Sequence, residues 1–201
     1  MSYNYKDIKL VLASASPRRR ELIQLLGLPF ECTVSEADES TCMKVPDEVV
    51  KEISRKKALW AYEHRGLGTN EVLIGADTVV AFENNILGKP ASENDARTML
   101  RMLQGNVHSV FTGVTLIWRP DNATGPNIIS FAQQTDVTFS KVSDNEIEEY
   151  LQTLDYRDKA GSYGIQGPFG RHVQQIHGDY NNVVGFPVNA VYEALKKYCC
   201  D

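Results

Sequence analysis

Residues 9–28 of the chain read KLVLASASPRRRELIQLLGL, a short apolar run followed directly by the signals that start and end a helix. Lys9 to Ala13 has the length and composition of a buried strand. Ser16 can cap a helix that has Pro17 at its first position and Gly27 just past its end. The apolar stripe of this helix would consist of Leu22, Leu25 and Leu26. The stretch therefore predicts a strand, a tight turn and a helix, which is the opening of an α/β protein.

The rest of the chain alternates between strand-like and helix-like segments. Helices are expected from Pro46 to about His64, after Ser92, after the capping-box pair Ser143 and Glu146, and from Pro187 onward. Strands are expected at residues 30–34, 72–74, 79–82, 107–118, 128–139, 172–176 and 182–184. This order of elements predicts an α/β fold with a mixed sheet. The length of 201 residues suits a single domain over residues 1–201.

Composition and charge narrow the class of protein. Hydrophobic residues make up 42% of the chain, and no apolar run reaches the roughly 18 residues that a membrane helix needs. The apolar stretch near the N-terminus is too short for a signal-peptide core, so we expect a cytoplasmic protein that binds no membrane. The net charge is −5, and the basic residues are dispersed except at 18–20 and 55–57. This distribution fits a small polyanionic ligand better than a nucleic acid.

Several common site patterns are missing from the sequence. The four cysteines form no C-x-x-C pair and no HExxH is present, so a zinc site is not expected. There is also no G-x-S-x-G elbow and no G-x-G-x-x-G behind a strand. These absences argue against a serine hydrolase and against a dinucleotide site.

The turn after the first strand, at residues 13–19, is a candidate anion site. Backbone N–H groups at a helix start favour negative charge, and arginine adds forked donors that match phosphate oxygens. Ser14, Arg18 and Arg19 are the side chains that would take part. The alternative interpretation is an ordinary helix cap with solvated arginines.

Two more charged residues are candidates for a functional role. Asp77 lies between two strand-like runs, which makes it a candidate metal ligand or general base. It can equally be an acid that satisfies turn amides. Lys89, in Gly88-Lys89-Pro90, can place a point charge on a phosphate or can be a solvated turn lysine. The proline after it rules out a P-loop.

Two glycine-rich segments follow later in the chain. Residues 158–167 read DKAGSYGIQG, and their three glycines suggest a backbone that turns tightly or approaches a ligand. Gln166 offers a donor and an acceptor that a pyrimidine edge can use. The alternative is an ordinary surface loop. Residues 178–187, GDYNNVVGFP, are interpreted as mainly structural.

Taken together, these segments resemble the Maf family, also called Maf/HAM-like nucleotide pyrophosphatases. The resemblance covers nearly the whole chain and keeps the family's order of motifs. It rests on LVLASASPRRREL at 10–22, IGADTVV at 74–80, LGKP at 87–90, HSVFTGV at 108–114, DKAGSYGIQG at 158–167 and GDYNNVVGFP at 178–187. It implies an elongated α/β protein of the Maf/ITPase-like kind, with a mixed sheet flanked by helices, two lobes with a central cleft, and often a homodimer.

The resemblance also implies a reaction and the residues that carry it. It implies hydrolysis of a nucleoside triphosphate to the monophosphate and pyrophosphate with a divalent cation such as Mg²⁺, Mn²⁺ or Co²⁺. The family's phosphate-binding residues fall on Ser14, Arg18 and Arg19. Its catalytic residues fall on Glu39, Lys57, Asp77 and Lys89, with Asp77 at the position of the base. Since Mg²⁺ prefers oxygen ligands, Glu39 and Asp77 are the natural metal ligands.

Three marker positions indicate the substrate branch that the chain resembles. The branch acting on dTTP, UTP and modified uridine nucleotides carries an arginine, a threonine and a glutamine where this chain has Arg19, Thr78 and Gln166. We therefore expect a dTTP/UTP pyrophosphatase. Two alternatives stay open: a 7-methyl-GTP or purine nucleotide pyrophosphatase, and a nucleotide-binding regulator of cell division with little turnover. One departure, Pro168-Phe169-Gly170 in place of Leu-Gly-Gly, would stiffen the loop after Gln166.

Overall fold

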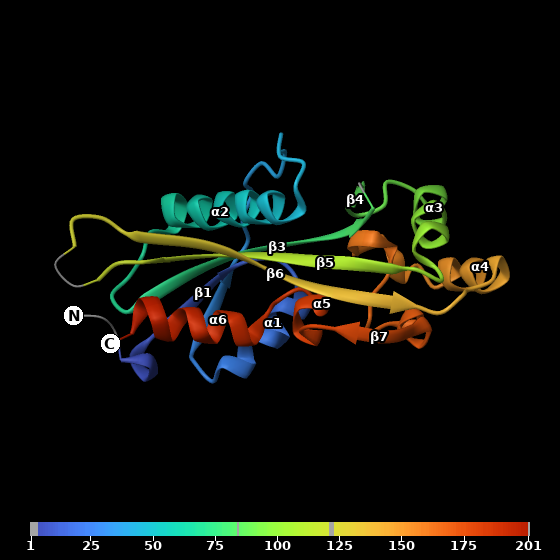
Figure 1. The fold of residues 1–201 in the computed structure, drawn as a ribbon. Coiled ribbons are helices and arrows are strands. Elements are labelled where there is room, and N and C mark those ends of the chain that lie inside the picture. Colours follow the sequence, from blue (N-terminus) through green and yellow to red (C-terminus); the bar gives the residue numbers. More distant parts are fainter. Residues whose placement is uncertain (1–3, 84, 121–122, 201) are drawn as a thin grey trace. The chain divides into compact units, whose positions relative to one another are not determined.

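The computed structural model describes residues 4–83, 85–120 and 123–200 (Figure 1). Its strands are β1 (Lys9–Ala13), β2 (Phe30–Thr33), β3 (Glu71–Phe82), β4 (Asn85–Leu87), β5 (Val107–Trp118), β6 (Asn127–Phe139) and β7 (Val173–His177). Its α-helices are α1 (Pro17–Ile23), α2 (Pro46–Arg65), α3 (Glu93–Leu103), α4 (Asp144–Gln152), α5 (Tyr180–Val184) and α6 (Val188–Ala194). No helix in these ranges combines the length and the apolar composition needed to span a membrane.

The strands form one mixed sheet. Their order is β2-β1-β3-β5-β6-β7, and β4 pairs with β3 outside this path. β1 runs parallel to both β2 and β3, whereas β4 is antiparallel to β3 and β7 is antiparallel to β6. The expected α/β class with a mixed sheet is confirmed.

The chain divides into two compact units. Unit 1 comprises residues 1–77, 112–133 and 185–201, and unit 2 comprises residues 78–111 and 134–184. Strands β3, β5 and β6 each contribute residues to both units. The single domain over 1–201 stays a prediction, and each unit is described by itself below.

Unit 1 is built by helices on both faces of its strands. α2 lies on one face, and α1 and α6 lie on the other (Figure 1). α2 approaches its face closely: a Cβ atom on Gly75 of β3 would lie 2.2 Å from the Ser54 carbonyl oxygen. A Cβ atom on Gly113 of β5 would lie 2.2 Å from the Val50 carbonyl oxygen. Only glycine therefore allows this helix to rest directly on the two strands. The buried residues between them include Val11, Ala13, Ala58, Ala61, Leu73 and Ile117.

Unit 2 has its own core, in which α3 and α4 pack on the other halves of the long strands. Its buried residues include Leu100, Leu103, Val110, Val137 and Ile147. Aromatic rings fill the centre, with the Phe139 ring 4.7 Å from Tyr163 and 5.3 Å from Phe169 between centroids. Phe169 belongs to the segment that departs from the Maf pattern, and it is fully buried. The departure thus supplies a core residue to unit 2.

Most expected elements are confirmed, and three details were wrong. Leu25 does not belong to the buried stripe of the first helix, because the chain tightens into a 3₁₀ turn at Gln24–Leu26 and leaves Leu25 65% exposed. The two runs around Asp77 form the single strand β3. Residues 182–184 lie in helix α5 and form no strand. The Asn182 amide donates to the Val110 carbonyl and to the Thr135 hydroxyl, contacts that sequence periodicity does not reveal.

Candidate active site

A lysine in unit 1 contacts two carboxylates from different segments. The Lys57 ammonium lies 2.7 Å from Oδ1 of Asp77 and 3.0 Å from Oε1 of Glu39. The Lys57 and Asp77 side chains are only 11% and 12% exposed, whereas Glu39 is 58% exposed. We call these three residues the Lys57 cluster. It combines a nearly buried ion pair with a carboxylate that faces solvent.

The close contact between α2 and β3 explains how Lys57 meets Asp77. Alternate residues of a strand share a face, so Asp77 lies on the same side of β3 as Gly75. Gly75 is in contact with Ser54 and Ala58 of α2, which flank Lys57 in the helix. The lysine therefore reaches over the strand to the carboxylate two residues beyond the glycine.

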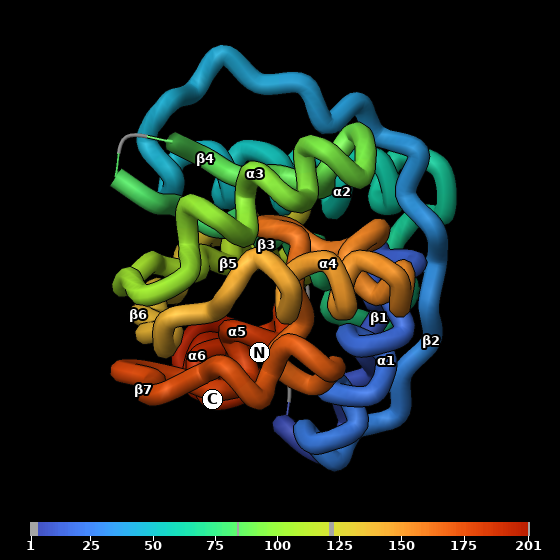
Figure 2. The backbone as a smooth tube through the Cα atoms, turned by 90° about the vertical axis from the view of Figure 1, so that its right-hand side faces the viewer, coloured from blue at the N-terminus to red at the C-terminus, as the bar shows by residue number. Residues whose placement is uncertain are grey.

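Glu39 comes from a segment without regular secondary structure. Residues 34–45, light blue in Figure 2, run from the end of β2 to the start of α2. The segment is tied to α2 a second time, because the Ser40 carbonyl accepts a hydrogen bond of 2.5 Å from Lys56. These two lysine contacts hold Glu39 beside the buried pair.

Ser14 and Arg19 contact each other at the turn between β1 and α1. The Ser14 hydroxyl oxygen accepts from the Ser16 amide at 3.2 Å and from Nη1 of Arg19 at 3.4 Å. The Arg19 amide is 3.5 Å from the Ser16 hydroxyl oxygen, which caps the helix. Two amides of this turn are therefore used internally, so positive charge here comes from arginine side chains more than from unpaired backbone N–H groups. Arg18 is half-buried in the first turn of α1.

The Arg19 side chain is held by a backbone group that sequence reasoning missed. Its Nε donates to the carbonyl oxygen of Gly185 at 2.9 Å. Gly185 has φ +121°, a conformation that favours glycine. The glycine in GDYNNVVGFP was the available signal, but residues 178–187 were interpreted as mainly structural. One edge of the guanidinium is thus fixed by the protein.

The charges around Arg19 act in opposite directions on its pKa. Burial lowers the pKa of Arg19, Asp77 raises it, Arg18 lowers it, and Glu39 raises it. An arginine stays protonated at neutral pH even when it is partly buried. Arg19 is therefore a permanent cation within the electrostatic reach of two carboxylates of the Lys57 cluster.

The remaining three predicted site residues belong to unit 2. Thr78 is a half-buried residue of β3 and directly follows Asp77 in the chain. Lys89 is exposed in the loop between β4 and α3, next to Gly88, whose carbonyl accepts from the Gly161 amide at 3.1 Å. Gln166 is exposed in the loop after Ser162. Unit 1 therefore brings six of the nine candidates together in two neighbouring sets, and unit 2 carries the other three.

The Lys57 cluster fits a divalent cation of the magnesium type. Mg²⁺ is typically held by one or two carboxylates, while water and substrate phosphates complete its coordination. Glu39 and Asp77 are two carboxylates that both lie within 3.0 Å of one ammonium nitrogen. Among the described residues, no group of three His, Cys, Asp or Glu side chains forms a metal cage. The donor set therefore suits an ion that is shared with a bound phosphate.

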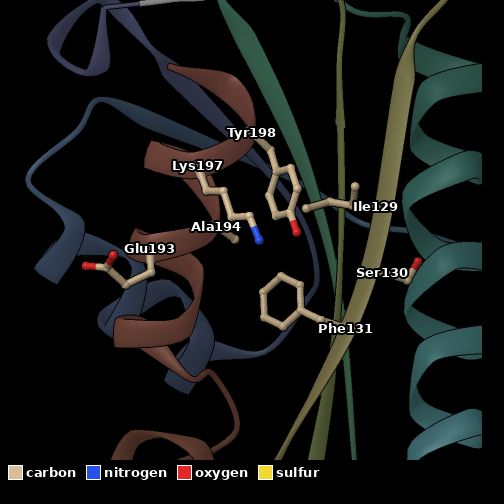
Figure 3. A pocket seen from close by; sticks show the side chains of 7 residues that line it. All are labelled: Ile129, Ser130, Phe131, Glu193, Ala194, Lys197 and Tyr198. Atoms are coloured by element: carbon tan, nitrogen blue, oxygen red, sulfur yellow. The ribbon is translucent and has the colours of Figure 1, made fainter. Parts of the chain in front are cut away.

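Unit 1 also has a hollow between β6 and the C-terminal helical segment, with a volume of about 450 Å³. Ile129 and Phe131 point from β6 toward Tyr198, whereas Ser130 points to the opposite face of the strand (Figure 3). The Lys197 ammonium lies 4.9 Å from the centre of the Tyr198 ring. None of the nine candidate residues lines this hollow.

Comparisons with known proteins match this chain over almost its entire length. The model of the family described as Maf-like protein matches residues 9–198. A protein from Agathobacter rectalis named dTTP/UTP pyrophosphatase is 46% identical, with 96% of this chain and 98% of the relative covered. Proteins of the same name from Bacillus cereus and Lachnoclostridium phytofermentans are 41% and 40% identical, with 96% of this chain and 91% and 96% of each relative covered. The chain belongs to the Maf family.

Proposed function

We propose that this protein hydrolyses dTTP, UTP and modified pyrimidine nucleoside triphosphates to the monophosphate and pyrophosphate. The names of its relatives support the substrate class. The proposed chemistry rests on Asp77, a nearly buried carboxylate with one oxygen held by Lys57. A carboxylate oriented in this way can accept a proton from a water molecule.

The proposed phosphate site uses Ser14, Arg18 and Arg19. The Ser14 oxygen already accepts two donors, so its own hydrogen can be donated to a phosphate oxygen. Arg19 would bring its guanidinium charge to the phosphates, while the Gly185 carbonyl holds its Nε and the Ser14 hydroxyl accepts from its Nη1. A chain of net charge −5 must concentrate cations locally to bind a triphosphate, and these arginines with Lys57 do so.

The proposed reaction is an in-line attack of water on the α phosphorus. Asp77 takes a proton from the water as the new P–O bond forms. The bond from the α phosphorus to the bridging oxygen breaks, and its electron pair leaves with pyrophosphate. Lys57 holds Asp77 in place, and Lys89 balances charge on the leaving pyrophosphate. In this proposal Thr78 and Gln166 read the base.

The proposal includes a divalent cation, Mg²⁺, Mn²⁺ or Co²⁺, at Glu39 and Asp77. When bound, such an ion neutralises phosphate charge and makes a coordinated water more acidic. The proposal also includes a homodimer, which rests on the family resemblance, and a cytoplasmic location, which was expected from the sequence.

The test is pyrophosphate release from a panel of UTP, dTTP, CTP, GTP, ATP and 7-methyl-GTP, with Mg²⁺ and with chelator. We expect release from UTP and dTTP that requires the metal. Release mainly from 7-methyl-GTP would overturn the substrate assignment, and tight nucleotide binding without product would support the regulator alternative.

A further inference from the structure

The exposed Gln166 is carried by a four-residue turn in unit 2. The Gly167 amide donates to the Gly164 carbonyl at 3.0 Å, which closes the turn over Ile165 and Gln166. Ile165 packs against the core of unit 2, whereas Gln166 is exposed. The turn thus points one side chain inward and presents the next one to solvent.

A nearly buried lysine lies beneath this turn. The Lys159 ammonium is 2.5 Å from the Asp155 carbonyl oxygen, 3.1 Å from Oδ1 of Asp155 and 2.8 Å from Oδ1 of Asp158. The Lys159 side chain is only 13% exposed. An ammonium has three N–H donors, so these three acceptors use all of them. Lys159 is consequently a structural cation, in contrast to the exposed Lys89.

Asp155 is fixed from its other side. Its Oδ2 accepts a hydrogen bond of 2.9 Å from the Tyr150 hydroxyl, and Tyr150 is 2% exposed. Burial and Asp155 together raise the pKa of Tyr150, so this hydroxyl keeps its proton and acts as a donor over the physiological range. Tyr150, Asp155 and Lys159 thus form a chain of polar contacts, which we call the Lys159 seat.

Both ends of the Gln166 turn rest on the Lys159 seat. A Cβ atom on Gly164 would lie 2.5 Å from Cε of Lys159. A Cβ atom on Gly167 would lie 2.5 Å from Oδ2 of Asp155. Neither glycine has a positive φ, so what the two glycines provide here is a close approach to the Lys159 and Asp155 side chains. The turn therefore contacts the Lys159 seat at both of its ends.

We propose that Lys159 and Asp155 are positioning residues for base selection: they hold the Gly164–Gly167 turn so that the Gln166 amide is presented in one orientation. The inference rests on the proposed function, in which Gln166 reads the base. UTP and CTP differ at the 4-position of the ring, which carries an acceptor oxygen in UTP and a donor amino group in CTP. An amide can discriminate between them only when its orientation is fixed.

The experiment compares kcat and KM for UTP and CTP in the full-length Lys159→Met variant. Losing the seat should raise KM for UTP by about tenfold with kcat within twofold, because base contacts lie away from the reacting phosphorus. The ratio of kcat/KM for UTP to that for CTP should fall by a similar factor. Lys141→Met, which removes an exposed lysine of unit 2, is the matched control and should leave both values unchanged.

An unchanged UTP to CTP ratio in folded Lys159→Met protein would overturn the inference, as would a loss confined to kcat. If that variant does not fold, Tyr150→Phe decides the question. It removes one hydrogen bond to Asp155 and should lower the ratio by roughly threefold, and an unchanged ratio contradicts the inference. Wild-type protein that releases no pyrophosphate from UTP would overturn the proposed function instead.

Discussion

Two ion clusters in unit 1 share the same two elements and differ in how completely their charges are paired. In each, α2 supplies a cation and β3 supplies a carboxylate: Lys57 meets Asp77, and Arg65 meets Glu71. The second cluster, completed by Lys9 and Glu31, is here called the Arg65 cluster. Helix α2 therefore contacts β3 through charge at two places along its length.

In the Arg65 cluster, each carboxylate is paired with cations. Glu71 accepts from Nη1 and Nη2 of Arg65 at 2.7 and 2.8 Å, from the Gly68 amide at 2.8 Å and from Lys9 at 3.1 Å. Arg65 also contacts Glu31, so two cations face two carboxylates. Hydrogen bonds from Arg65, the Gly68 amide and Lys9 outweigh burial and lower the pKa of Glu71 to about 2. Such a saturated carboxylate has little capacity left for a ligand.

The charges of the Lys57 cluster are less completely paired than those of the Arg65 cluster. One ammonium faces two carboxylates, and Glu39 extends into solvent. Two carboxylates that share one lysine, with Arg19 within their electrostatic reach, suit the proposed site, which would bind a cation together with a phosphate. Charge is therefore balanced at one end of the contact, whereas at the other end two carboxylates share one lysine, as the proposed site requires.

Asp77→Asn should have the largest effect. It removes the proposed base but keeps the shape of the side chain, so kcat for UTP should fall by roughly two to four orders of magnitude. The melting temperature should fall less than in Glu71→Gln, because Asp77 contacts one lysine whereas Glu71 accepts four hydrogen bonds. Pyrophosphate release and thermal unfolding check both parts, and retained activity would show that Asp77 is not the base.

Glu71→Gln should lower the stability of the fold and leave kcat unchanged. It takes the charge from a carboxylate whose side chain is 9% exposed and leaves Arg65 with only Glu31. The free energy of unfolding should fall by about 3 kcal/mol. The variant should keep wild-type kcat at a temperature where it is folded. A large loss of kcat in folded protein would contradict the assignment of this cluster to stability.

The same carboxylate predicts a pH dependence of stability. The ordinary pKa of 4.5 falls to about 2 in the fold, so the stabilisation is complete above pH 4.5 and is lost as pH falls toward 2. Its full size is roughly 3 kcal/mol and only part of it is lost at pH 3.5. Urea unfolding of the wild type and of Glu71→Gln should therefore converge at low pH. Parallel profiles would contradict the lowered pKa.

Glu39→Gln should have the smallest effect of the three substitutions. The side chain is 58% exposed, so the free energy of unfolding should change by less than about 0.5 kcal/mol. Activity should fall by about tenfold, and part of the loss should be recovered at higher Mg²⁺ concentration, since a metal ligand is removed. A loss that Mg²⁺ does not relieve would argue against Glu39 as a ligand.

Local signals predicted the elements well, because caps and turns depend on neighbouring residues. The helix start at Ser16 and Pro17, the αL residue Gly27 and the capping box of Ser143 and Glu146 are all confirmed. Residues 182–184 were wrongly predicted as a strand, since a short apolar run has no period that separates strand from helix. Its conformation depends on Asn182 contacts with strands far away in the sequence.

The candidate site also depends on contacts between residues that are far apart in the sequence. Motif resemblance named Lys57 and Asp77, but nothing in their separation of twenty residues predicts that they touch. That contact depends on Gly75, which lets α2 lie on β3. The Gly185 carbonyl that holds Arg19 was missed because a glycine signals an unusual backbone conformation but not the side chain that its carbonyl accepts from. The roles of all nine candidate residues stay predictions that kinetics can test.

The most direct test of the proposed attack at the α phosphorus is hydrolysis of UTP in ¹⁸O-labelled water, with mass analysis of both products. We expect one label in the phosphate of UMP and none in pyrophosphate, since Asp77 would direct water to the α phosphorus. Label in the pyrophosphate, or release of orthophosphate from the intact triphosphate, would contradict the account.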